Sequence, residues 1–118
     1  MTLVDSSVWV DHLRRSNARL AGLLDVGQVA CHPFVIGEIA LGNLKRRAVV
    51  LGLLAELPTA PVVSHDEVLT LVDRRRLSGR GIGWIDAHLL ASAIVERASL
   101  WTLDRRLAAV ARDLGLAA

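Results

Sequence analysis

The sequence is poor in cysteine and in long apolar runs, and each shortage excludes a class of protein. Cys31 is the only cysteine among the 118 residues, so the chain has no internal disulfide framework of the kind typical of small secreted domains. No apolar run approaches the roughly 18 residues that a membrane-spanning helix requires. The first residues include no basic segment followed by an apolar stretch and a cleavage site. We therefore expect a cytoplasmic protein without a secretion signal.

Apolar residues as a class, by contrast, are abundant. They make up 53% of the chain, and the mean hydropathy is +0.42, which excludes an intrinsically disordered protein. A chain of 118 residues is long enough to bury one substantial core but short for two domains. Because no repeat, low-complexity tract or linker divides it, we expect residues 1–118 to form a single globular domain.

The basic residues are almost all of one type. Thirteen of the fourteen are arginine, the formal net charge is +2 and the isoelectric point is about 9.5. The planar guanidinium group suits phosphate oxygens, which is compatible with binding a nucleic-acid backbone. A solvated arginine-rich surface explains the same composition. The cationic clusters are Arg14-Arg15, Lys45-Arg46-Arg47, Arg74-Arg75-Arg76 with Arg80, and Arg105-Arg106.

Short β-type runs alternate with longer helical patterns along the chain. The predicted strands are Thr2–Val4, Gln28–Cys31, Pro61–Val63 and Leu100–Leu103. The predicted helices are Ser7–Arg15, Ala18–Asp25, Pro33–Asn43, Arg46–Glu56, His65–Leu77, Trp84–Ala98 and Arg105–Leu114. This alternation predicts an α/β fold with a central parallel sheet covered by helices on both faces. Ligands of such folds bind at the carboxyl ends of the strands.

Four acidic residues lie in largely apolar settings. They are Asp5 after the first strand, Glu38 within an apolar helix, Asp86 at the start of another, and Asp104 after the last strand. Asp5 and Asp104 could instead cap the helices that follow them, and Asp86 could favour the positive end of its helix. Glu38 has no capping role in mid-helix. A buried carboxylate without a partner costs several kcal/mol or takes up a proton. A shared Mg²⁺ or Mn²⁺ ion would supply the partner, because these ions select carboxylate oxygens.

The pattern resembles the PIN-domain ribonucleases, and among them the VapC-type toxins of bacterial type II toxin–antitoxin systems. The resemblance spans nearly the whole chain and rests on Asp5 with Ser6-Ser7, Glu38 in its apolar helix, Asp86 in WIDAHLLA and Asp104 in WTLDRRL. It implies a three-layer α/β/α sandwich and an acidic quartet at these four positions. By the resemblance, Asp5, Asp86 and Asp104 would be the principal metal ligands. Glu38 would be a further ligand or would orient a metal-bound water.

The same resemblance implies an activity and partners. The activity would be endonucleolytic cleavage of RNA, with transfer RNA or ribosomal RNA as the target, in a homodimer that a VapB-type antitoxin inhibits. Ser6, Ser7 and Thr102 would hold carboxylates or metal-bound waters in place. Contacts to RNA phosphates are expected from Arg14, Arg15, Lys45, Arg46 and Arg80. The family commonly has a further edge strand after the last helix. Only Gly115–Ala118 follows the last predicted helix here, so the sequence does not decide whether this strand forms.

Two other functions are compatible with parts of the sequence. A phosphoacceptor receiver domain has a similar length and acidic strand ends, but it needs a lysine late in the chain, and Lys45 is the only lysine. A PIN-like domain without catalysis, acting as a scaffold or an RNA-binding module, is harder to separate from the enzyme. The presence of all four acids argues against this module, and Mn²⁺ binding at the carboxylates would distinguish the two.

Overall fold

A three-stranded parallel sheet lies at the centre of the computed structural model, which describes residues 1–118. The strands are β1 (Thr2–Val4), β2 (Val29–Ala30) and β3 (Ser99–Trp101). Strand β1 lies between the other two, and Leu3 is in register with Ala30 on one side and Leu100 on the other. Because the strands are parallel, their carboxyl ends lie at the same edge of the sheet.

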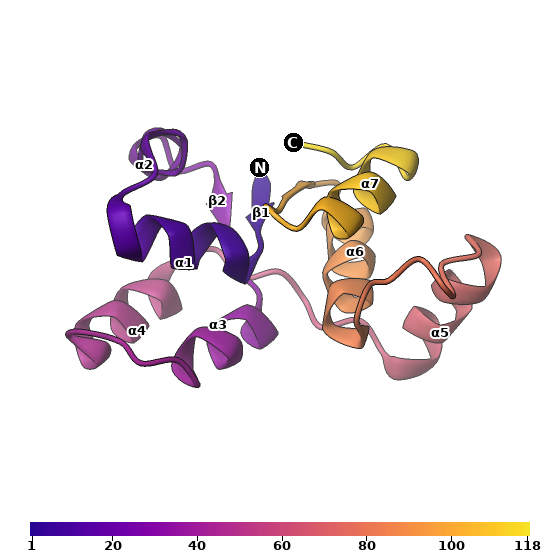
Figure 1. Cartoon of the computed structure of the whole chain (residues 1–118), viewed down its shortest axis with the longest axis horizontal. Helices are drawn as coiled ribbons and strands as arrows, with labels where there is room; N and C mark the ends of the chain where they lie inside the picture. The colour runs from indigo at the N-terminus through magenta and orange to yellow at the C-terminus, as the bar shows by residue number, and fades with distance from the viewer.

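Helices follow each strand and cover the sheet. Their bounds are α1 (Ser6–Arg15), α2 (Ala18–Asp25), α3 (Pro33–Ala40), α4 (Arg47–Glu56), α5 (His65–Arg74), α6 (Trp84–Glu96) and α7 (Arg105–Asp113). Figure 1 shows α1 to α4 on one side of β1 and α5 to α7 on the other. The predicted α/β fold, a three-layer α/β/α sandwich around a parallel sheet, is confirmed. No helix has the length and apolar character needed to cross a membrane.

Helix α6 is the most deeply buried helix, as its apolar sequence predicts. Every residue from Ala87 to Ala93 is buried. Leu89 and Leu90 join Leu3 and Leu100 of the sheet in the main core. Full burial of a leucine side chain stabilises the fold by about 1.5–3 kcal/mol. The helix is therefore fixed against the sheet, and so is the start of α6, where Asp86 lies.

The strand predicted at Pro61–Val63 is wrong. The chain instead contacts β2 through a single parallel bridge between Cys31 and Thr59, in which the Ala60 amide donates to the Cys31 carbonyl at 2.8 Å. The next bonds of the ladder would need amide hydrogens from Pro58 toward Val29 and from Pro33 toward Ala60, and proline has none, so the pairing ends at this bridge. The edge strand that the sequence left undecided at Gly115–Ala118 is reduced to a second isolated parallel bridge, between Leu100 and Ala117.

Two helices end earlier than the sequence predicts. Helix α3 ends at Ala40 rather than Asn43, and the chain turns through Gly42 and Asn43. Helix α5 ends at Arg74 rather than Leu77, because Arg76 adopts a left-handed conformation with φ of 53°. The turn after α3 matters for function, since it forms one wall of a groove described below. The other predicted helix ends, and those of the three strands present, coincide with the structure or differ from it by one or two residues.

Candidate active site

Asp5 is a buried carboxylate at the carboxyl end of the central strand. It is only 5% exposed, and it occupies the cap position of α1 without using its side chain as a cap. Its Oδ2 instead accepts hydrogen bonds from Ser7 Oγ at 2.8 Å and from Thr102 Oγ1 at 2.7 Å. The helix-capping alternative is therefore not what this side chain does. Two hydroxyl groups hold it in place from opposite ends of the sequence.

The two hydroxyls are themselves oriented by backbone amides. The Leu103 amide donates to Ser7 Oγ at 3.0 Å, and the Asp104 amide donates to Thr102 Oγ1 at 3.0 Å. Each hydroxyl has one hydrogen to donate, and the short distance directs it to Asp5. The third hydroxyl, Ser6 Oγ, lies 3.5 Å from Asp5 Oδ1, at the limit of a hydrogen bond. Ser7 and Thr102 therefore fix Asp5 more firmly than Ser6 does.

Asp86 lies in the first turn of α6 and is half-buried. Its Oδ2 accepts a hydrogen bond from the Gly83 amide at 2.9 Å, which satisfies one free amide at the helix start. Burial raises the pKa of Asp86, and the nearby charges of Asp5 and Asp104 raise it further. The hydrogen bond from the Gly83 amide acts in the opposite direction and lowers the pKa. Asp86 thus has a structural bond and also belongs to a group of mutually repelling carboxylates.

Glu38 is an exposed side chain on α3 that faces the same group of acids. Partial desolvation of its carboxyl group raises the pKa of Glu38, and repulsion from Asp5 and then Asp86 raises it further, while the nearby Ser6 hydroxyl opposes the rise. These electrostatic effects link α3 to β1 and α6. Because α3 ends at Ala40, Glu38 lies in the last turn of the helix and not in mid-helix as predicted. A negative charge there opposes the helix dipole, so the helix end does not explain a glutamate at this position.

Asp104 is the acid that most clearly has a structural role. Its Oδ1 accepts hydrogen bonds from the Arg106 amide at 2.9 Å and from the Leu107 amide at 3.0 Å. Asp104 therefore caps α7, which is the alternative role that its position in the sequence allowed. Its other oxygen, Oδ2, makes no hydrogen bond within the chain. Asp104 is exposed, and its charge contributes to the raised pKa of Asp86.

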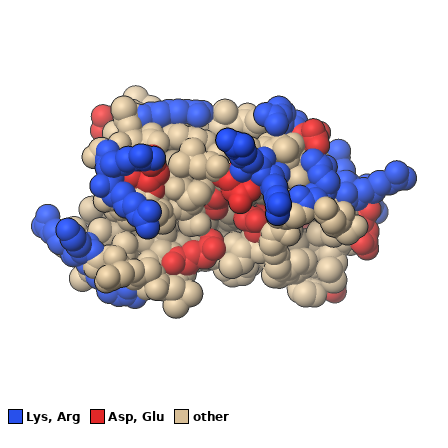
Figure 2. All heavy atoms as spheres, in the orientation of Figure 1, with Lys and Arg blue, Asp and Glu red and all other residues tan.

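No cation within the chain compensates these four carboxylates. The ion pairs of the structure join Arg15 to Asp11 and Arg80 to Asp113. Figure 2 shows acidic atoms gathered near the middle of one face, with lysine and arginine side chains to either side. No three of the His, Cys, Asp and Glu side chains are arranged to hold one metal ion as they stand. We call Asp5, Glu38, Asp86 and Asp104 the acidic cluster; it is open rather than a closed cage.

Comparison with known proteins agrees with this arrangement. A family model described as PIN domain matches residues 2–113. The chain belongs to the PIN domain family. Two similar proteins are called Ribonuclease VapC32, from Mycobacterium tuberculosis strains CDC 1551 / Oshkosh and ATCC 25618 / H37Rv. Each is 58% identical over 118 residues, which cover 99% of this chain and 95% of the relative. The resemblance to VapC-type PIN proteins is confirmed.

The five cationic residues expected to bind RNA differ in what they contact in this PIN domain. Two of the five expected to bind RNA are already paired, since Arg15 Nε lies 2.6 Å from Asp11 Oδ1 and Arg80 Nη2 lies 2.8 Å from Asp113 Oδ2. Arg46 is exposed and adopts a left-handed backbone conformation before α4. Arg14 and Lys45 line a groove and form no ion pair.

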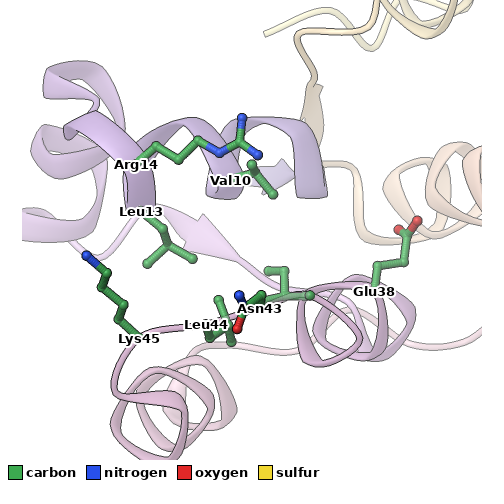
Figure 3. Close-up of a pocket in the computed structure, with 9 residues that line it drawn as sticks. Val10, Leu13, Arg14, Glu38, Asn43, Leu44 and Lys45 are labelled. Atoms are coloured by element: carbon green, nitrogen blue, oxygen red, sulfur yellow. The ribbon is translucent and has the colours of Figure 1, made fainter.

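This groove is the feature of the PIN domain that the sequence did not reveal. It has a volume of about 430 Å³ and lies between α1 and the turn that follows α3, and we call it the α1/α3 groove. Its lining includes Val10, Leu13, Arg14, Glu38, Asn43 and Lys45. Figure 3 shows these side chains around the space between the two elements. The predicted helix Pro33–Asn43 included the turn residues that form this wall. Glycine and asparagine are both typical of turns, so Gly42-Asn43 is the sequence signal for an earlier helix end.

Proposed function

We propose that this protein is a metal-dependent endoribonuclease that hydrolyses RNA phosphodiester bonds. The observation that carries the proposal is Asp5, a buried carboxylate at the end of the central strand that is held by two hydroxyls and paired with no cation. Membership of the PIN family and the printed name of the relatives, Ribonuclease VapC32, support the reaction class. RNA can be cleaved by its own 2′-hydroxyl or by a water molecule. Attack by water requires that the water be activated, and the carboxylates of the acidic cluster are suited to bind and orient it.

The donor set of the acidic cluster fits a hard divalent cation such as Mg²⁺ or Mn²⁺. All its side-chain donors are oxygens, and their mutual repulsion raises the pKa of Asp86 and of Glu38 after the effect of burial. Asp5, Asp86 and Asp104 would hold the cation. When bound, such an ion neutralises charge on the phosphoryl group and lowers the pKa of a water.

The remaining residues of the site position these groups. Ser7 and Thr102 occupy Asp5 Oδ2 and leave Oδ1 for a ligand, apart from the long contact with Ser6. Glu38 is exposed at the rim of the cluster, where its carboxylate can orient an attacking water. Asp104 keeps Oδ2 free while Oδ1 caps α7.

The histidines argue against metal-independent cleavage by an acid and base pair. His32 is fully buried between the Phe34 amide and Ser92. His88 is also buried, and burial lowers its pKa. His12 accepts a hydrogen bond from the Asn17 amide through Nδ1. The fourth histidine, His65, is exposed on α5, and its ring lies 4.9 Å from that of Trp84. Because His32 and His88 are buried, no two exposed histidines stand together as an acid and a base.

We extend the proposal to partners. The protein would act in the cytoplasm as a toxin that cleaves transfer RNA or ribosomal RNA, with a VapB-type antitoxin as its inhibitor. A homodimer is supported by apolar side chains that stand exposed on two helices, Val49 and Leu53 on α4 and Leu69 on α5. Sedimentation at micromolar concentration tests the dimer, and a monomer there would contradict it.

Cleavage of total bacterial RNA by the purified protein tests the proposed reaction. We expect discrete fragments with Mg²⁺ or Mn²⁺, no fragments with EDTA, and no fragments from the Asp5→Ala variant. Asp25→Ala is the matched control, because Asp25 is an exposed acid at the end of α2. If the wild type binds RNA but neither it nor the variants cleave it, the protein is a non-catalytic RNA-binding module instead.

A further inference from the structure

The α1/α3 groove has apolar walls that no other part of the chain covers. Val10 and Leu13 stand three residues apart on α1, so they share one face of the helix, and their exposed fractions are 38% and 40%. Leu44, in the turn after α3, lines the opposite side. A volume of about 430 Å³ falls within the range of about 300–1,000 Å³ that small-ligand sites occupy. The space suits a flat apolar group such as a nucleobase.

The cations of the groove are free to bind a ligand. Neither Arg14 nor Lys45 forms an ion pair, in contrast with Arg15 and Arg80. Figure 3 shows Lys45 at one end of the groove, Glu38 toward the other, and Arg14 along the α1 side. Two uncompensated positive charges beside an apolar wall suit a ligand that alternates phosphates with flat rings. Single-stranded RNA has this alternation.

Asn43 gives the groove one group that can distinguish ligands. It is the only uncharged polar side chain in the lining, and it is exposed. An amide both donates and accepts hydrogen bonds, so it can pair with the edge of an unstacked base. The apolar wall would contact the face of the same base.

Continuity with the acidic cluster decides in favour of RNA over an acidic peptide. Glu38 belongs to both the groove and the acidic cluster. A strand whose reacting phosphate lies at the acidic cluster can therefore place a neighbouring nucleotide over the groove. An acidic peptide satisfies the two cations but lacks the alternation of phosphates and flat rings that suits cations beside an apolar wall.

We propose that the α1/α3 groove binds one nucleotide of single-stranded RNA next to the phosphate that is cleaved. Arg14 and Lys45 bind its flanking phosphates. Val10, Leu13 and Leu44 contact the face of its base, and Asn43 reads the edge of that base. This inference deepens the proposed function and rests on it, because the reacting phosphate must lie at the acidic cluster.

Sequencing the cleavage products of a random single-stranded RNA pool tests the specificity step. The wild type is expected to prefer one base at a fixed position beside the cut, and Asn43→Ala to lose a preference on the order of tenfold there while still cleaving the pool. Gln28→Ala is the matched control, since Gln28 is an exposed amide outside the groove. An unchanged preference in Asn43→Ala would overturn the role of Asn43.

Binding of a labelled random RNA in EDTA tests the groove even if the wild type cleaves nothing. In Arg14→Ala and Lys45→Ala, the slope of log affinity against log salt is expected to fall in magnitude by about 0.7 each. Arg112→Ala, an exposed arginine without an ion pair on α7, should leave the slope unchanged. Equal slopes in all four proteins overturn the groove as an RNA site. Loss of affinity only for a purified antitoxin would assign the groove to a protein partner and overturn it too.

Discussion

Thr102 Oγ1 lies 2.7 Å from Asp5 Oδ2, although the two residues are 97 positions apart in sequence. The distance is short because β1 and β3 are parallel neighbours, with Val4 in register with Trp101. The residues that follow them therefore meet at the same edge of the sheet. A hydroxyl on one strand end thus orients a carboxylate on the next, which is the basic relationship of the acidic cluster.

Replacing this hydroxyl with a methyl group should loosen the cluster. Thr102→Val keeps the shape of the side chain but removes the donor to Asp5 and the acceptor of the Asp104 amide. We expect the free energy of unfolding to fall by about 1–3 kcal/mol. RNA cleavage per folded molecule should fall by about 10–100-fold. Denaturant unfolding and a cleavage assay measure the two effects.

Thr70→Val is the control for this substitution, because Thr70 is exposed on α5 and its hydroxyl donates only to the Asp66 carbonyl. It should leave cleavage unchanged. If Thr102→Val cleaved RNA as fast as the wild type, the orientation of Asp5 by Thr102 would have no catalytic role.

The carboxylates should titrate as a coupled group in the absence of metal. Burial raises the pKa of Glu38 first, and the charges of Asp5 and Asp86 raise it further. Asp86→Asn removes one of those charges, so the pKa of Glu38 should fall. Carbon-13 NMR of the Glu38 carboxyl in EDTA measures this shift, with Asp66→Asn as a control on the exposed start of α5. The same pKa in both variants would mean that Glu38 and Asp86 do not interact.

Asp86→Asn should also stabilise the metal-free protein. Because the pKa of Asp86 is higher in the folded chain than its ordinary value, the folded state binds a proton more readily than the unfolded state. Stability is therefore lost as the pH rises through these two values. Asparagine removes the repulsion and can still accept from the Gly83 amide. We expect a higher melting temperature for Asp86→Asn at pH 7 in EDTA, and a lower one would contradict this.

His32 should make the protein sensitive to acid. Burial, followed by the charge of His88, lowers the pKa of His32 from 6.5 to about 4. The Phe34 amide donates to Nδ1, and Ser92 Oγ lies 3.1 Å from Nε2. Because the Ser92 hydroxyl donates to the Pro61 carbonyl at 2.7 Å, Nε2 carries the single ring hydrogen. A second proton on Nδ1 would oppose the Phe34 amide.

The unfolded chain takes up a proton on His32 near pH 6.5, whereas the folded chain does so only near pH 4. Stability therefore falls as the pH drops through this window, by up to about 3 kcal/mol. His32→Asn keeps an acceptor for the Phe34 amide and should reduce this loss. Urea unfolding from pH 7 to pH 4 measures it, and an identical slope in both proteins would contradict the prediction.

Two glycines in the loop between α5 and α6 offer a matched pair of substitutions. Gly79 and Gly81 both adopt left-handed backbone conformations, with φ of 76° and 79°. A Cβ at Gly81 would lie 2.7 Å from Cδ of Arg106, whereas a Cβ at Gly79 meets no atom within 4 Å. Alanine should cost about 1–2 kcal/mol of stability at either position through the backbone. Only Gly81→Ala should also displace the Arg106 side chain.

The difference between the two variants isolates the contact with Arg106. Gly81→Ala should be less stable than Gly79→Ala in thermal unfolding, and the NMR signals of the Arg106 guanidinium should shift only in Gly81→Ala. Equal stability and unchanged Arg106 signals in both would show that Arg106 does not pack on Gly81 in solution.

The sequence predicts the order and type of the elements well because periodicity is a local property. The apolar pattern from Ala87 to Ala93 predicts a buried helix, and all these residues are buried. The strand predicted at Pro61–Val63 was wrong because an apolar run in a loop resembles a short strand. What decides pairing there is the missing amide hydrogen of Pro58 and of Pro33, together with the position of Thr59 opposite Cys31.

Side-chain partners are harder to predict than elements because they depend on which strand ends meet. The sequence places two serines after Asp5, and the turn into α1 decides that Ser7 forms a bond of 2.8 Å and Ser6 only a contact of 3.5 Å. The α1/α3 groove escaped prediction because it depends on where α3 ends. Asn43 is a helix residue in the predicted fold and a groove residue in the structure.

Titration with Mn²⁺ tests the central claim most directly, namely that the missing partner of the acidic cluster is a divalent cation. Loss of the free Mn²⁺ signal in electron paramagnetic resonance reports binding without any RNA. Saturable binding is expected for the wild type and for Asp25→Asn, and little binding for Asp5→Asn and Asp86→Asn. If all four proteins bound Mn²⁺ equally, or none did, the acidic cluster would not be a metal site and the account would be wrong.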